Sequence, residues 1–159
     1  MGGYRDPVLS FRRVSDDKRM RLRGLHHVTA ISSDLERTIA FYRDTLGLPV
    51  VHDAPSDDDP DARHVWFDGG DGDSHLSFME YAQLPAGVVG VGSTHHFALR
   101  VESPEEQEAW RDYLRERGVD CTDVLDRGSF RSIYIRDPDG HVVEIATRGP
   151  GFGAGEPSA

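Results

Sequence analysis

Hydrophobic and polar positions in the first half of the chain follow the order strand, helix, then three strands. Residues 25–32 alternate with a period of two, and apolar residues then recur at helical spacing from Leu35 to Leu46. Ser33 or Asp34 is suited to cap the start of this helix. Three further strands are expected at 48–53, 62–68 and 75–81.

The second half of the chain repeats this pattern. An alternating strand at 94–101 precedes a helix that Ser103 caps, with Pro104 at its first position and a stop at Gly118. Strands are expected at 119–124, 129–136 and 141–147. Each half therefore predicts a βαβββ unit.

One such unit leaves an apolar sheet face uncovered, so two units are expected to pack together as one domain. The prediction is an α+β fold in which tandem modules at about 24–82 and 93–148 form one incomplete, barrel-like mixed sheet around a cavity. This domain spans 23–149, preceded by an arm at 1–22 and followed by a Gly- and Pro-rich tail at 150–159.

Strand phase predicts which side chains face the cavity, because successive residues point to opposite sides of a sheet. In the second module Phe97, Leu99 and Val101 belong under the helix, which turns His96 inward. The same argument turns Glu144 and Tyr134 inward. In the first module it places His27 and Thr29 inside.

Composition narrows the function classes. The 159 residues carry a formal net charge of −10, which argues against nucleic acid as a partner, because binding phosphates needs a basic face. No apolar run approaches the roughly 20 residues of a membrane span, so no membrane partner is expected. A single cysteine, Cys121, fits a cytoplasmic location.

Two histidines and one carboxylate, His27, His96 and Glu144, converge on the predicted cavity. Such a set can hold Fe(II) on one side and leave positions open for substrate and oxygen. The alternative from the pattern alone is that the histidines are structural cavity residues and that Glu144 pairs with an arginine.

The segments "HHVTAI", "HHFALRV" and "DPDGHVVEIAT" resemble the vicinal-oxygen-chelate superfamily of glyoxalases, bleomycin-resistance proteins and extradiol dioxygenases. Within it, "LSFMEY", the doubled His and "DRGSFRSIYIRDPDGHVVEIATRGPGF" resemble dioxygenases that cleave hydroquinone rings. The resemblance implies Fe(II), with Mn, Zn or Ni as alternatives, bound by His27, His96 and Glu144. It implies a small hydroquinone- or catechol-like substrate and O₂.

The resemblance also implies roles for residues around the metal. Tyr134 is expected to hydrogen-bond the bound oxygen or the substrate, and Arg127 to stabilise negative charge, with a surface salt bridge as the alternative for Arg127. Thr29 and His26 are expected near the substrate, although strand phase places His26 behind the sheet.

Similar hydroquinone-cleaving enzymes have four βαβββ units in a chain, whereas two are found here. A second copy could supply the missing units, so we expect a homodimer.

The position equivalent to Glu144 in the first module distinguishes the subfamilies. An ungapped overlay of "DGDSHLSFMEYA" on "DPDGHVVEIATR" sets Phe78 opposite Glu144, where it would line the substrate site. A register shift could instead bring in Glu80 as a fourth ligand. That would favour a glyoxalase-type isomerase or lyase; a protein that binds a small antibiotic-type molecule is the remaining alternative.

Overall fold

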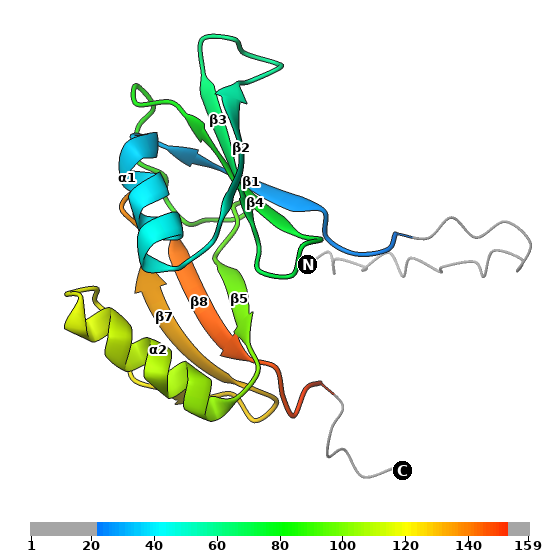
Figure 1. Cartoon of the computed structure of the whole chain (residues 1–159), viewed down its shortest axis with the longest axis vertical. Coiled ribbons are helices and arrows are strands. Elements are labelled where there is room, and N and C mark those ends of the chain that lie inside the picture. The colour runs from blue at the N-terminus through cyan, green and yellow to red at the C-terminus, as the bar shows by residue number, and fades with distance from the viewer. Residues whose placement is uncertain (1–21, 153–159) are drawn as a thin grey trace, which may run out of the picture.

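The computed structural model describes residues 22–152 and contains the two expected βαβββ units (Figure 1). The elements of the first unit are β1 (His27–Ser32), α1 (Leu35–Ile39), the π-helical η2 (Ala40–Thr45), β2 (Val50–Pro55), β3 (Arg63–Asp68) and β4 (His75–Glu80). Those of the second are β5 (Phe97–Val101), α2 (Pro104–Glu116), β6 (Leu125–Asp126), β7 (Arg131–Arg136) and β8 (Val142–Thr147). The predicted arm, up to residue 21, and the tail from residue 153 lie outside the described residues.

The strands form two open, mixed sheets of four strands each, with the orders β1-β4-β3-β2 and β5-β8-β7-β6. In each sheet the first strand pairs in parallel with the last, and the remaining pairs are antiparallel. The α+β class and the two modules are therefore confirmed. The predicted incomplete, barrel-like sheet consists of two open sheets, one in each module, which are not hydrogen-bonded to each other.

The helices begin where the sequence predicts. Asp34, one of the two expected caps, accepts hydrogen bonds from the amides of Glu36 and Arg37. Ser103 accepts one from Glu106, and Pro104 occupies the first position of α2. The strand predicted at 119–124 is wrong: these residues are not a strand, and the two-residue β6, Leu125–Asp126, follows them.

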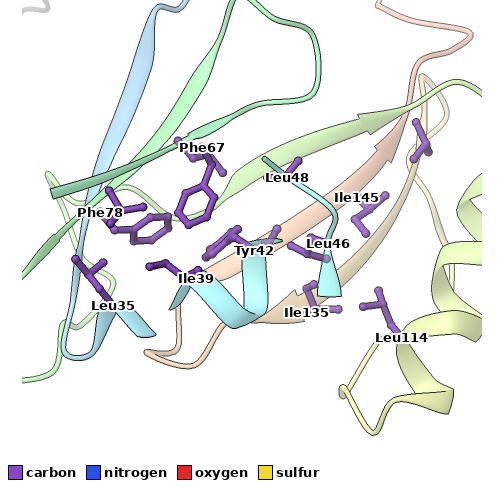
Figure 2. Packing of buried hydrophobic residues seen from close by; sticks show 14 of the residues in the cluster. Leu35, Ile39, Tyr42, Leu46, Leu48, Phe67, Phe78, Leu114, Ile135 and Ile145 are labelled. Atoms are coloured by element: carbon purple, nitrogen blue, oxygen red, sulfur yellow. The ribbon is translucent and has the colours of Figure 1, made fainter. Parts of the chain in front are cut away.

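A single hydrophobic core lies between the helices and the sheets. Figure 2 shows it running from Leu35 and Phe78 through Tyr42 to Ile135 and Leu114, so both modules contribute to one cluster. The ring centroid of Tyr42 lies 4.8 Å from that of Phe78. Removing this apolar area from water is the main force that joins the modules.

Two hydrogen bonds beside this core also connect the modules. The hydroxyl of the fully buried Tyr42 donates to the carboxylate of Asp137 at 3.0 Å, and the guanidinium of Arg37 donates to the carbonyl of Pro138 at 2.8 Å. Burial and the neighbouring Asp137 raise the pKa of Tyr42 far above its usual range, so this phenol stays protonated and donates. The turn before β8 therefore holds the first helix.

Tyr42→Phe is expected to lower the free energy of unfolding by about 1.5–3 kcal/mol, because it removes a hydrogen bond to a charged, buried partner. Tyr113→Phe is the matched control, since its hydroxyl donates to a neutral carbonyl, that of Thr45, and should cost only about 0.5–1.5 kcal/mol. Urea unfolding measures both. Equal losses would contradict a special role for the Tyr42–Asp137 bond.

The faces of the sheets that point away from the helices are open. Figure 1 shows α1 and α2 on the same side of the two sheets. On the opposite face His27, Thr29 and Ile31 of β1 are exposed, as are Ala98 and Arg100 of β5. These uncovered faces, called the inner faces below, carry the residues that the sequence predicts for the site.

Candidate functional site

The second module brings His96 and Glu144 together on its inner face. Nε2 of His96 lies 2.9 Å from Oε2 of Glu144, and Glu144 is only 3% exposed. The other carboxylate oxygen, Oε1, accepts a hydrogen bond from the buried hydroxyl of Ser132. The predicted alternative, in which Glu144 pairs with an arginine, is not what the structure has.

Tyr134 and Arg127 lie beside this pair. Tyr134 is paired with Glu144 across β7 and β8, and its ring centroid is 5.8 Å from that of His96. Nη2 of Arg127 donates to the Tyr134 hydroxyl at 3.3 Å. The alternative for Arg127, a surface salt bridge, is not formed with the described residues: the nearby Asp123 pairs with Arg115, and Asp126 accepts the amide hydrogen of Gly128. A histidine, a carboxylate, a phenol and a guanidinium thus line one face.

The first module presents a matching but less polar face. His27 and Thr29 point to the same side of β1, and the hydroxyl of Thr29 is 2.8 Å from that of the buried Ser77. The ring centroid of His27 lies 4.8 Å from that of Trp66 on β3.

In each module the inward histidine contacts the histidine that precedes it in the sequence. Nδ1 of His26 is 2.8 Å from Nδ1 of His27, and the same distance separates Nδ1 of His95 and His96. The His26 ring also lies beside that of His75, at 5.9 Å between centroids. The doubled His of the sequence is thus a repeated local contact that leaves Nε2 of the second ring for other partners.

The structure does not gather the whole predicted ligand set. Within residues 22–152, no three His, Cys, Asp or Glu side chains lie close enough to hold a metal ion. His96 and Glu144 are together, whereas His27 belongs to the other sheet. The modules nevertheless share a cavity of about 260 Å³, whose lining includes Thr29 and His96.

The predicted inward position of Phe78 is wrong. Phe78 is fully buried on the helix side, against Tyr42 and Phe67, as Figure 2 shows. Strand register identifies the true equivalent of Glu144: Ala98 pairs with Glu144 in the second sheet, and Thr29 pairs with Ser77 in the first. Ser77 therefore occupies the position that the overlay assigned to Phe78.

One extra residue in a turn explains the error. The connection between β3 and β4 covers 69–74, whereas that between β7 and β8 covers 137–141 and is one residue shorter. An ungapped overlay therefore displaces β4 by one residue, which reverses every side chain of that strand.

Glu80 also lies on the helix side, which contradicts its prediction as a fourth ligand. Its carboxylate accepts the amide hydrogen of Leu35 at 2.8 Å, at the start of α1. A carboxylate at this position satisfies a free amide and favours the positive end of the helix. Glu80 is thus a helix-capping residue.

Sequence reasoning missed Ser77, Ser132, Trp66 and His64 on the inner faces. For three of them the sequence alternation could have shown the direction. On β3 the apolar Val65 and Phe67 alternate with His64 and Trp66. On β4 the apolar Leu76 and Phe78 flank Ser77. Strand phase applied to these positions would have turned the polar and Trp side chains inward. For Ser132 the same phase holds, but only the structure reveals its bond to Glu144.

None of the helices in residues 22–152 has the length and apolar character that crossing a bilayer requires.

Comparison with known proteins identifies related sequences. The family model described as "Glyoxalase/Bleomycin resistance protein/Dioxygenase superfamily" matches residues 24–145. "Putative ring-cleaving dioxygenase MhqA" of Bacillus subtilis is 30% identical over 82% of this chain and 41% of its own length. Metallothiol transferase FosB of Staphylococcus haemolyticus is 27% identical over 79% of this chain and 84% of its own.

A solved structure agrees with the fold. The "putative dioxygenase from Bacillus subtilis" superposes with a TM-score of 0.71 at 29% identity, over 79% of this chain and 41% of that one. The chain thus spans less than half the length of the ring-cleaving relatives that it matches.

Proposed function

This chain belongs to the glyoxalase/bleomycin resistance protein/dioxygenase superfamily, and from that premise we propose that it is a metal-dependent dioxygenase that cleaves a small hydroquinone- or catechol-like ring. The observation that carries the proposal is the inner face of the second module. There a histidine–carboxylate pair lies beside a phenol that an arginine orients. The relatives named as ring-cleaving dioxygenases support the reaction class.

The donor groups fit a divalent first-row metal. His96 and Glu144 bring an imidazole nitrogen and a carboxylate oxygen within 2.9 Å of each other, and Ser132 holds the second oxygen of Glu144. Together with His27 they form a set of two histidines and one carboxylate, for which Fe(II) is our choice and Mn, Zn or Ni are alternatives. Ferrous iron, when bound, would relay electrons from an electron-rich aromatic ring to O₂.

The other residues bind and polarise the substrate. The Tyr134 hydroxyl accepts a hydrogen bond from Arg127, which leaves its own proton free to be donated to an oxygen of the substrate. The guanidinium of Arg127 stabilises negative charge that develops there, as fixed donors do, and the second copy proposed below would shield it from water. In the overall reaction a ring carbon–carbon bond breaks and both atoms of O₂ enter the product.

We further propose that the complete site is shared by two copies of the chain. His27 of one copy joins His96 and Glu144 of the other, which accounts for the two open inner faces and for the incomplete ligand set within residues 22–152. A twofold dimer makes two identical sites in this way and covers exposed apolar side chains such as Ile31 and Val51.

A group transfer that uses a thiol is the second candidate function. Metallothiol transferase FosB, which is 27% identical over 79% of this chain, supports it. A glyoxalase-type isomerase is disfavoured, because a serine, Ser77, stands where a fourth carboxylate ligand is expected.

Oxygen uptake is expected when the protein is loaded anaerobically with Fe(II) and then mixed with a substituted hydroquinone or catechol and O₂. An oxygen electrode measures it, and mass spectrometry should find two oxygen atoms from labelled O₂ in the ring-opened product. Tyr134→Phe should lower this rate by about 10²–10⁴-fold, the usual contribution of a positioned proton donor. No uptake with any phenol, but consumption of a thiol with an electrophile, would replace the dioxygenase with the transferase.

A further inference from the structure

Four aromatic rings gather at the centre of the first module's inner face. Trp66 lies at 4.8 Å from His27, 5.0 Å from His64 and 6.2 Å from His75, measured between ring centroids. Trp66 is half-buried, so part of its ring faces the open side of the sheet. We call these four residues the aromatic wall.

Two histidines of the aromatic wall have a ring nitrogen that is not used within the chain. Nε2 of His64 and Nδ1 of His75 are buried and have no hydrogen-bond partner among the described residues. Burial lowers the pKa of His64, so this ring is neutral at neutral pH. The four rings form an aromatic surface to which His64 adds no charge, and such a surface suits an aromatic ring.

The internal repeat gives Trp66 a counterpart in the second module. Trp66 pairs with Ser77 across β3 and β4, as Tyr134 pairs with Glu144 across β7 and β8. Because Ser77 and Glu144 are equivalent, Trp66 and Tyr134 are equivalent as well. Each ring lies beside the inward histidine of its own module, 4.8 Å from His27 or 5.8 Å from His96.

We infer that the aromatic ring of the substrate stacks on Trp66 of one copy, with Tyr134 of the second copy facing it across the site that the two inner faces form. The inference rests on the proposed function for the meeting of the two inner faces. It assigns the first module the selection of an aromatic ring, while the polar groups of the second module act on the ring oxygens. The hydroxyl of the exposed Thr29, which lies 2.8 Å from that of the buried Ser77, borders the wall and can hydrogen-bond a phenolic oxygen.

Trp66 can report on this contact directly, because the chain has only two tryptophans. Trp110, the other one, lies in α2 and packs against Tyr113 and the core. Trp110→Phe therefore leaves Trp66 as the only fluorophore of its kind, and Trp66→Phe leaves Trp110 as the matched control. The probe is para-methoxyphenol, a redox-stable analogue of hydroquinone, added without O₂ to metal-free and Fe(II)-loaded protein.

We expect saturable quenching in Trp110→Phe and none in Trp66→Phe. Cyclohexanediol, which has two hydroxyls but no aromatic ring, should not quench. By calorimetry, Trp66→Leu should weaken binding of para-methoxyphenol about tenfold, whereas Trp66→Phe should retain affinity within about threefold, because a phenyl ring still stacks. Unchanged Fe(II) binding and thermal midpoint in Trp66→Leu would show that its effect is local.

Two outcomes separate this inference from the proposed function. If para-methoxyphenol quenches Trp66 and binds Trp66→Leu more weakly, but no phenol supports oxygen uptake, then the role of the aromatic wall is supported and the dioxygenase activity is contradicted. If oxygen uptake is clear but the KM for the phenol is the same in Trp66→Leu as in the wild type, then the dioxygenase activity is supported and the role of the aromatic wall is contradicted.

Discussion

Glu144→Gln is expected to abolish stoichiometric metal binding and to lower the metal affinity by more than ~100-fold. Removing a residue that only hydrogen-bonds a metal ligand already lowers metal affinity about 10–100-fold, and Glu144 is proposed as a ligand itself. The amide keeps the shape of the side chain and its bond to Ser132 but removes the charge that attracts a cation. Anaerobic titration with Fe(II), followed by metal analysis after gel filtration, measures the effect.

Glu80→Gln is the matched control for this substitution. It makes the same chemical change on the helix side, where the carboxylate caps α1, and should leave the metal stoichiometry unchanged. Retention of one tight metal per site in Glu144→Gln, or its loss in Glu80→Gln, would overturn the proposed ligand set.

Mixing two inactive variants tests whether the site is shared. His27→Ala and Glu144→Gln should each be inactive alone. After the chains are unfolded and refolded together in equal amounts, about a quarter of the wild-type activity should return, because half of the dimers are mixed and each mixed dimer has one intact site. A mixture that stays inactive despite mixed dimers would place all three ligands in one chain.

Ser77→Glu is expected to separate metal binding from turnover. Ser77 is buried but occupies the inner-face position equivalent to Glu144, which is itself a buried carboxylate, so a glutamate there can offer the metal a second carboxylate. Affinity for Fe(II) should hold or rise, while oxygen uptake should fall by ~100-fold or more, because the position used by substrate or O₂ is occupied and the reactants are displaced. Metal titration and the oxygen electrode measure the two effects on the same preparation.

Ser77→Ala and Phe78→Glu are the controls. Ser77→Ala removes only a hydroxyl and should keep both metal and most of the turnover. Phe78→Glu forces an unpaired carboxylate into the core beside Tyr42 and should prevent folding, because such burial costs several kcal/mol of a total stability that is itself only about 5–15 kcal/mol. If Ser77→Glu leaves oxygen uptake unchanged, Ser77 does not face the metal.

The local pattern of the chain was sufficient for its elements and for many of the side-chain directions. Apolar residues at period two and at helical spacing predicted both βαβββ units, and Ser103 with Pro104 predicted the start of α2. Alternation also placed His96, Glu144 and Tyr134 on one face, because the direction of a strand side chain depends only on its neighbours along the chain.

Register between strands needed the tertiary structure. Hydrogen bonds between β1 and β4 decide that Ser77, not Phe78, is equivalent to Glu144, and a turn longer by one residue hid this from the sequence. The same is true of Glu80, whose carboxylate could face the cavity or the helix until the start of α1 was placed beside it.

The arrangement of the modules was decided at a still longer range. The sequence predicted two modules but not that their helix sides would share one core through Tyr42 and Asp137, leaving both inner faces open. That choice depends on contacts between residues far apart in the chain, which no local pattern encodes. His96 and Glu144 meet through the pairing of β5 with β8 within one module, whereas the position of His27 relative to them depends on how the modules pack.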